Sequence, residues 1–94
     1  MSIQIQNYVR TLRRRHGLTQ LQLAWLMGKS DRSVVSRIER GMRVPNLEMA
    51  LAIEVILGAP VRKVFRGLAN TVEGQVVRRR GITDDEDGAN ASRA

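Results

Sequence analysis

The chain has 94 residues and carries sixteen Lys and Arg against nine Asp and Glu, a formal net charge of +7. This length holds one small domain, and such an excess of positive charge is typical of proteins that bind a polyanion rather than of small-molecule enzymes. The absence of cysteine and the single histidine, His16, exclude disulfides, cysteine-ligated metals, a thiol nucleophile and a metal site built on two histidines of one chain.

The first predicted helix covers residues 3–15, because Ile5, Val9 and Leu12 recur at helical spacing and share one face. Three arginines occupy its last turn, where positive charge is favourable beside the partial negative charge of a helix C-terminus. Gly17 follows, and glycine readily adopts the left-handed conformation that ends many helices.

Two short helices come next, with little chain between them. Thr19 is a good N-cap for a helix over residues 20–27, which ends at Gly28. The following helix runs to about Arg40, and the sequence leaves two caps open for it, Ser30 and Asp31.

The last two predicted helices have equally clear boundaries. Asn46 caps a helix over residues 47–57, and Gly58 ends it. Pro60 suits the first turn of a fifth helix that extends as far as Arg79. Its apolar stripe consists of Val61, Val64, Phe65, Leu68, Val72 and Val76. Because no segment shows sustained strand alternation, the expected fold class is all-α, with five helices of which the last is long.

The second and third predicted helices are spaced as in a helix-turn-helix, in which the second helix of the pair enters the major groove of DNA. The third predicted helix suits that position, since Val35 and Ile38 can face the core. Its other side offers polar groups that can read base edges: Arg32, Ser33, Ser36 and Arg37.

A longer motif surrounds this pair. It consists of Arg13, Gly17-Leu18-Thr19-Gln20, Leu23-Ala24, Gly28, Val35-Ser36-Arg37-Ile38-Glu39-Arg40-Gly41 and Pro45. On these residues, the chain resembles the Xre/Cro/phage-repressor (lambda-repressor-like) helix-turn-helix family over residues 7–66. One interval, from Gly28 to Glu39, is a residue longer than is usual in the family, and we place the extra residue in the turn. The register of the recognition helix therefore stays open by one position.

The resemblance implies a role for individual residues. Arg13 and Glu39 would form a partly buried ion pair that orients the third helix. The residues that would face the groove are Arg32, Ser33, Ser36 and Arg37, and which arginine contacts a base and which a phosphate is left open. The residues that would contact phosphates are Gln20, Lys29, Arg40, Arg43 and Asn46.

The function that the resemblance implies is sequence-specific binding of double-stranded DNA by a transcriptional regulator, and we expect repression by a homodimer. The alternative is an antitoxin that binds a toxin protein and regulates its own operon; DNA binding without sequence preference is a third hypothesis. We expect no enzymatic activity, no cofactor and no metal, because the sequence contains no catalytic Ser/His/Asp set, metal-ligand cluster or phosphate-binding glycine loop.

The second predicted helix is apolar nearly all round, whereas a surface helix has a single apolar stripe. Its residues Leu21, Trp25 and Leu26 therefore need a cover. We expect Trp25 to pack against the fifth helix of the same chain, with a dimer partner as the alternative. For the fifth helix, which ends in three arginines, the alternatives are a brace within the chain, a dimer interface and a second arm on DNA.

The charge divides the chain in two. Residues 1–80 contain fifteen basic and five acidic residues, a net charge of +10, whereas residues 81–94 carry a net charge of −3 with four acidic residues at 84–87. The end of the chain has one large apolar residue, Ile82, and cannot bury enough surface to repay the entropy of ordering. We therefore expect a DNA-binding domain over residues 1–80 and a disordered acidic tail over residues 81–94.

The N-terminus lacks a basic start followed by a long apolar run. The longest apolar run, residues 49–53, is far shorter than the roughly 20 residues that span a bilayer. We therefore expect a cytoplasmic protein, and the resemblance implies a bacterial or phage-encoded one.

Overall fold

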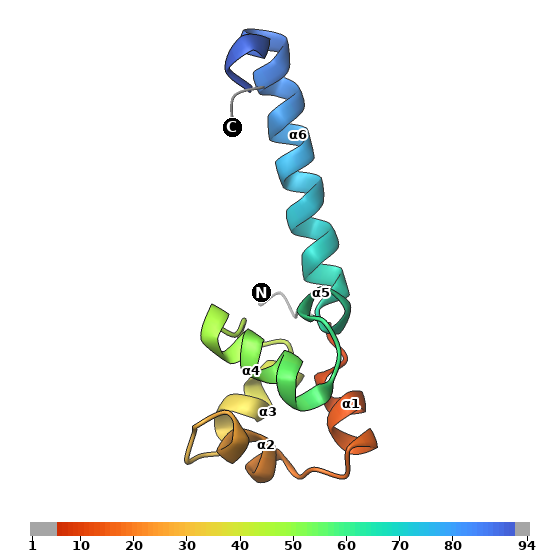
Figure 1. Ribbon diagram of the computed structural model, residues 1–94, viewed down its shortest axis with the longest axis vertical. Helices are drawn as coiled ribbons and strands as arrows, with labels where there is room; N and C mark the ends of the chain where they lie inside the picture. Colours follow the sequence, from red (N-terminus) through yellow and green to blue (C-terminus); the bar gives the residue numbers. More distant parts are fainter. Residues whose placement is uncertain (1–5, 92–94) are drawn as a thin grey trace.

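The computed structural model describes the backbone of residues 6–91 and the side chains of residues 6–81 (Figure 1). The described residues form helices and contain no strand. In chain order the helices are α1 (Val9–Arg15), α2 (Gln20–Leu26), α3 (Ser33–Glu39), α4 (Leu47–Leu57), α5 (Val61–Val64) and α6 (Arg66–Ala91). The all-α class is confirmed, with six helices in place of the five that the sequence predicts.

Helix α1 begins later than the apolar spacing predicts. Asn7 lies just before it and its side-chain Oδ1 accepts a hydrogen bond from the Val9 backbone N–H (3.1 Å). Residues 6–8 are not helical, and Ile5 of the predicted face lies outside the described residues. At the other end, His16 is a helix-end residue whose Nε2 lies 2.9 Å from the Leu57 carbonyl, which joins the end of α1 to the end of α4.

Helix α2 is capped as predicted. The Thr19 side chain accepts a hydrogen bond from the Gln22 N–H (3.0 Å), and the Gln22 side chain accepts one from the Thr19 N–H (2.8 Å). These reciprocal bonds satisfy two donors that a helix start leaves unpaired. The turn after α2 opens at Gly28, whose φ of 83° is one that residues with a Cβ rarely adopt.

The Asp31 side chain caps the start of α3. Its Oδ1 accepts a hydrogen bond from the Ser33 N–H (2.8 Å), so Asp31 rather than Ser30 takes the capping role that the sequence leaves open. At the far end, the Met42 N–H donates to the Arg37 carbonyl (2.8 Å) and Gly41 has a φ of 75°. This pattern satisfies the last carbonyls of a helix and reverses the chain.

Helix α4 has the predicted bounds. The Asn46 side chain accepts a hydrogen bond from the Met49 N–H (2.8 Å), and Gly58 ends the helix in the left-handed conformation. One face of α4 lies against the other helices of the domain. The apolar residues that form the core come from α1 to α5 and the residue after α5: Val9, Leu23, Ala24, Val34, Val35, Ile38, Met49, Ile53, Leu57, Val64 and Phe65.

The predicted fifth helix is broken in two at Phe65. This residue is only 4% exposed and has a φ of −113° and a ψ of 50°, outside the helical region. The side chain enters the core, and the backbone bends to place it there. The bend leaves α5 as a single turn and starts α6 in a new direction. A straight helix over residues 61–79 was therefore the wrong expectation, because core packing at one residue overrides the local helical pattern.

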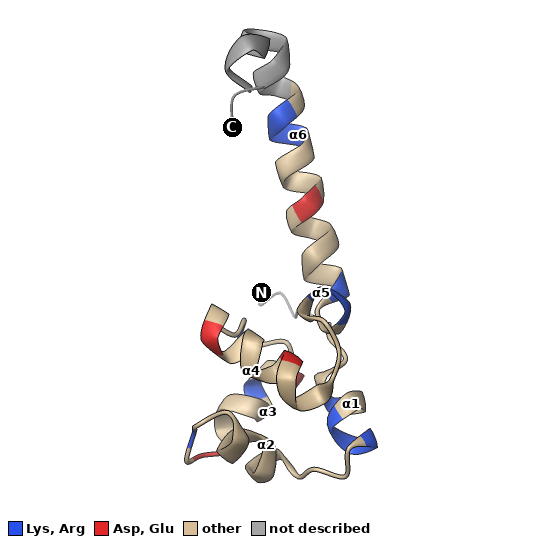
Figure 2. Cartoon of the chain, in the orientation of Figure 1, with Lys and Arg blue, Asp and Glu red and all other residues tan. Residues whose placement is uncertain are grey.

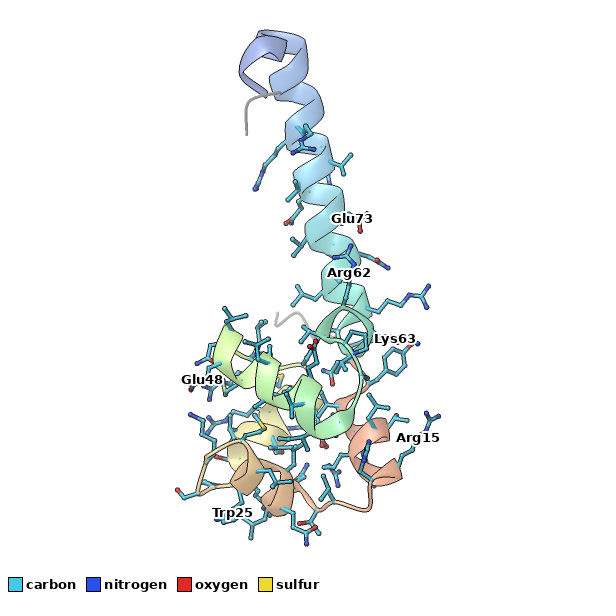
Figure 3. The ribbon with its side chains drawn as sticks, in the orientation of Figure 1. Arg15, Trp25, Glu48, Arg62, Lys63 and Glu73 are labelled. Carbon is cyan, nitrogen blue, oxygen red and sulfur yellow. The ribbon has the colours of Figure 1, made fainter. Side chains whose placement is uncertain are left out.

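Helix α6 extends from the domain on the side opposite the α2–α3 pair (Figure 1). Every side chain from Asn70 to Gly81 is exposed. Trp25 lies at the other end of the molecule on α2 and is 73% exposed (Figure 3). The prediction that α6 covers Trp25 within the same chain is wrong, because the bend at Phe65 turns α6 away from α2.

The backbone of α6 stays helical through residues 81–91, where the composition predicts disorder. The division of the chain at residue 80 stays a prediction. Within the part of the chain that the structure describes, we find no helix with the length and hydropathy required to cross a membrane.

Candidate nucleic-acid interface

Helix α3 turns its apolar residues inward, and its four candidate groove residues lie on the other side. Val35 and Ile38 are each 1% exposed, and Val34, which the sequence analysis did not assign to the core, is also buried. On the outer side, Arg32 and Arg37 are exposed, and the remaining two candidate groove residues, Ser33 and Ser36, are half-buried. The longer turn before α3 thus leaves the predicted inner face in place.

A buried ion pair connects the end of α3 to α1. The Arg13 Nε donates to the Glu39 carboxylate at 2.5 Å and Nη2 donates to it at 3.2 Å, which gives a two-bond contact. The Arg13 Nη1 also donates to the Leu18 carbonyl (2.8 Å). The two side chains are 10% and 3% exposed. Such a pair fixes geometry, since a buried carboxylate without its partner is costly.

Gln20 belongs to the same network. Its Nε2 donates to the Glu39 carboxylate at 3.1 Å, so Glu39 binds side chains from both α1 and α2. Gln20 is half-buried at the first turn of α2. One N–H of its amide is therefore engaged inside the protein, and the sequence analysis did not foresee this bond.

Asn7 provides a third connection to the end of α3. Its Nδ2 donates to the Ile38 carbonyl at 2.8 Å, while its Oδ1 accepts from Val9 as described above. The next residue, Tyr8, donates its backbone N–H to the Val64 carbonyl (2.9 Å). Sequence reasoning missed Asn7; the available signal was an Asn just before the apolar pattern of α1, although its long-range partner leaves no trace in the sequence.

The remaining residues predicted to contact phosphates lie in the turn before α3, directly after α3 and in the segment that leads into α4. Arg43 and Asn46 are exposed in the segment that leads into α4, and Lys29 is half-buried in the turn before α3. Arg40 is exposed after α3, with its Nε 3.4 Å from the Ser36 carbonyl. Helix α2 carries no charged residue, whereas α1 and α3 both carry arginines (Figure 2). The positive charge of the domain therefore flanks α2 instead of lying on it.

Two closely spaced helices, a polar outer face on the second and basic residues around it define a DNA-binding helix-turn-helix, the fold of a transcriptional regulator. The model of the Helix-turn-helix family HTH_3 matches residues 9–64, and the chain belongs to this Xre-like family. The match ends before α6 begins.

A solved structure supports the same assignment. The restriction-modification controller protein C.AhdI from Aeromonas hydrophila is similar to this chain, with 40% sequence identity and a TM-score of 0.54. The match covers 61% of this chain and 85% of the controller chain. No curated protein sequence matches the chain.

Proposed function

We propose that this protein represses transcription by binding a specific sequence of double-stranded DNA, with α3 in the major groove. The proposal rests on the two faces of α3: the inner face is buried and bonded to the rest of the domain, and the outer face carries exposed arginines. Val35, Ile38 and Glu39 hold the helix, and Arg32 and Arg37 point their charge outward. A helix held in this way can present a fixed set of groups to base edges.

Arg32 and Arg37 are the strongest candidates for base contacts. A guanidinium group can donate two hydrogen bonds to O6 and N7 of a guanine, and such a contact is worth about 1–3 kcal/mol of discrimination between bases. Ser33 and Ser36 supply short hydroxyl groups that read bases less selectively. The four side chains together would determine the preferred sequence.

The phosphate contacts would come from residues on both sides of the groove. The candidates are Gln20, Lys29, Arg40, Arg43 and Asn46. The Asn46 Oδ1 is engaged as the cap of α4, so its Nδ2 would be the donor to a phosphate oxygen. In the same way Gln20, held by Glu39, would use its second N–H. These contacts fix the position of the domain on the duplex and carry no sequence information.

The protein would act as a homodimer. Helix α3 has seven residues and is about 10 Å long, so it covers roughly three base pairs. Three base pairs cannot single out one site among the roughly 10⁶ or more that a genome offers. A second copy that reads a second half-site supplies the missing specificity. The likeness to a restriction-modification controller protein supports a regulatory role.

The antitoxin hypothesis has one observation in its favour. Leu21, Trp25 and Leu26 of α2 are 54%, 73% and 48% exposed and form an apolar patch that a protein partner could cover. A stable toxin partner that co-purifies with the chain and is lost on Trp25→Ser would support this second function.

Selection of bound sequences from a random DNA pool tests the main proposal. The expected result is one enriched sequence with two related halves about one helical turn apart. The matched control is the same selection with Arg37→Ala, which should lose the preference at one position of each half. A pool that shows no enrichment would instead support binding without sequence preference.

A further inference from the structure

A cleft of about 470 Å³ lies between one face of α1 and the chain that runs from the end of α4 to the start of α6. On the α1 side it is lined by Tyr8, Thr11, Leu12 and Arg15, which recur at helical spacing and share one face. Pockets that bind small molecules have volumes of about 300–1,000 Å³. The cleft is therefore large enough for a small ligand.

The apolar part of the lining belongs to the domain core. Val64 is fully buried, and Leu12 and Ala59 pack against the core cluster. The Tyr8 backbone N–H donates to the Val64 carbonyl (2.9 Å), so a hydrogen bond joins the two sides of the cleft. The core and this bond hold the apolar lining in place, and it suits the apolar part of a ligand.

Three cations line the same cleft. Arg15 comes from α1, Lys63 from α5 and Arg66 from α6, and all three are exposed. Figure 3 shows Arg15 and Lys63 on the same side of the domain. Among the residues whose side chains the structure describes, none of the three cations has an acidic partner.

The sequence explains why this charge is not neutralised. No Asp or Glu occurs in residues 1–30 or 55–72, which include both sides of the cleft. The two acids that flank the second of these segments make other bonds: Glu54 accepts from the Val61 N–H (2.8 Å), and Glu73 pairs with Arg62. A concave surface with charge of one sign raises the local concentration of ions of the opposite sign. The cleft therefore favours an anion.

The cleft lies on a different face of α1 from the one that holds α3. Arg13 bonds to Glu39 at the end of α3, and Arg15 is two residues further on and thus nearly opposite around the helix. DNA bound at the outer face of α3 does not need this side of α1. A small anion is therefore a better occupant of the cleft than a DNA strand.

We infer that the cleft between α1 and α5 binds a small organic phosphate, with the phosphate at the three cations and the apolar part against Leu12 and Val64. A phosphate monoester carries a charge of about −1.5 to −2 at pH 7 and has three acceptor oxygens. A carboxylate has a single charge and compensates three cations less well. The hydroxyl groups of Tyr8 and Thr11 provide further donors.

A titration of the isotope-labelled full chain with phenyl phosphate, followed by NMR at constant ionic strength, tests the site. The largest shifts of the amide signals should occur in residues 8–15 and 59–66. Phenyl phosphate should bind more tightly than inorganic phosphate or phenol, because it uses both parts of the lining. Equal affinity for phenyl phosphate and inorganic phosphate would overturn the inference, and so would shifts that are largest in α2 and α3.

Charge-matched variants separate a defined site from the overall positive charge. Arg15→Gln and Lys63→Gln should each weaken the binding of phenyl phosphate about threefold to fivefold, the range of an exposed ion pair. Arg10→Gln is the control, because Arg10 is exposed on α1, carries the same charge and does not line the cleft. A loss with Arg10→Gln as large as that with Lys63→Gln would show attraction by net charge alone and refute the site.

The same titration with duplex DNA present distinguishes a free ligand from the DNA backbone. Phenyl phosphate should bind with unchanged affinity. If DNA displaces it, and Arg15→Gln and Lys63→Gln also weaken DNA binding, the cleft is a contact for the DNA backbone and the inference is wrong. A chain that binds phenyl phosphate in the cleft but selects no DNA sequence would refute the repressor proposal alone.

Discussion

Removal of the Glu39 carboxylate should destabilise the domain more than any other single loss of an ion pair that we describe. In Glu39→Ala, the guanidinium of Arg13 stays nine-tenths buried and keeps the Leu18 carbonyl as its remaining partner. Breaking a buried pair by removing one partner costs about 3–5 kcal/mol, a large share of the roughly 5–15 kcal/mol that stabilises a small domain. Urea unfolding followed by circular dichroism measures the change.

The chain supplies a matched control for this variant. Glu73 pairs with Arg62 on the surface, with side chains 57% and 68% exposed, so Glu73→Ala should cost no more than about 1 kcal/mol. The double variant Arg13→Met/Glu39→Leu should recover part of the loss, because an apolar pair needs no compensation for buried charge, while the Leu18 carbonyl and the Gln20 amide each lose a partner. If Glu39→Ala unfolds at the same urea concentration as Glu73→Ala, the buried pair does not hold α3 as argued.

Three further predictions concern DNA binding. Arg37→Ala should reduce discrimination between the selected sequence and mismatched DNA, whereas Arg43→Ala should weaken binding to both alike; competition titrations separate the two effects. Asn7→Asp keeps an acceptor for the Val9 N–H but loses the donor to Ile38, so it should cost about 1–3 kcal/mol of stability and reduce discrimination. Wild-type stability of Asn7→Asp would contradict the argument that the bond to the Ile38 carbonyl holds the end of α3. Affinity should fall with salt at a log–log slope of about −0.9 per phosphate contact, and a flat dependence would contradict DNA binding.

Local signals explain why much of the fold could be predicted. Thr19 and Asn46 cap their helices as the sequence indicates, because a cap depends on neighbours two or three residues away. Gly58 ends α4 for the same local reason. The inner face of α3 also follows from periodicity, since Val35 and Ile38 can only be buried together on one side of a helix.

Long-range packing explains what could not be predicted. Gly67 stands two residues after Phe65, but a single glycine does not by itself place a break, and the bend at Phe65 depends on a core that includes α1 and α4. Without this bend, the sequence predicts one straight helix that packs against α2 and covers Trp25, which is wrong. The bonds of Asn7 to Ile38 and of Gln20 to Glu39 span 31 and 19 residues, and no spacing rule connects such distant positions.

The sequence predicted which residues belong to the site better than it predicted the contacts that they make. The sequence and its family resemblance named Arg13 and Glu39 as a pair, and the structure contains that pair. Contacts of Arg32, Arg37 and the other candidate residues with DNA stay predictions, since they depend on the shape of a partner. The structure adds that Gln20 donates a hydrogen bond to Glu39 in the DNA-free protein.

The residues that hold α3 and the residues proposed to read DNA are different residues. Val34, Val35, Ile38 and Glu39 contact the rest of the domain, whereas the residues at 32, 33, 36 and 37 lie on the outer side. Exchanges at the two exposed positions, Arg32 and Arg37, should therefore change the operator while leaving the free energy of unfolding within about 0.5 kcal/mol, as is usual for surface substitutions. Substitutions in α3 can therefore change the DNA sequence that the domain prefers, and each variant in such a series stays folded.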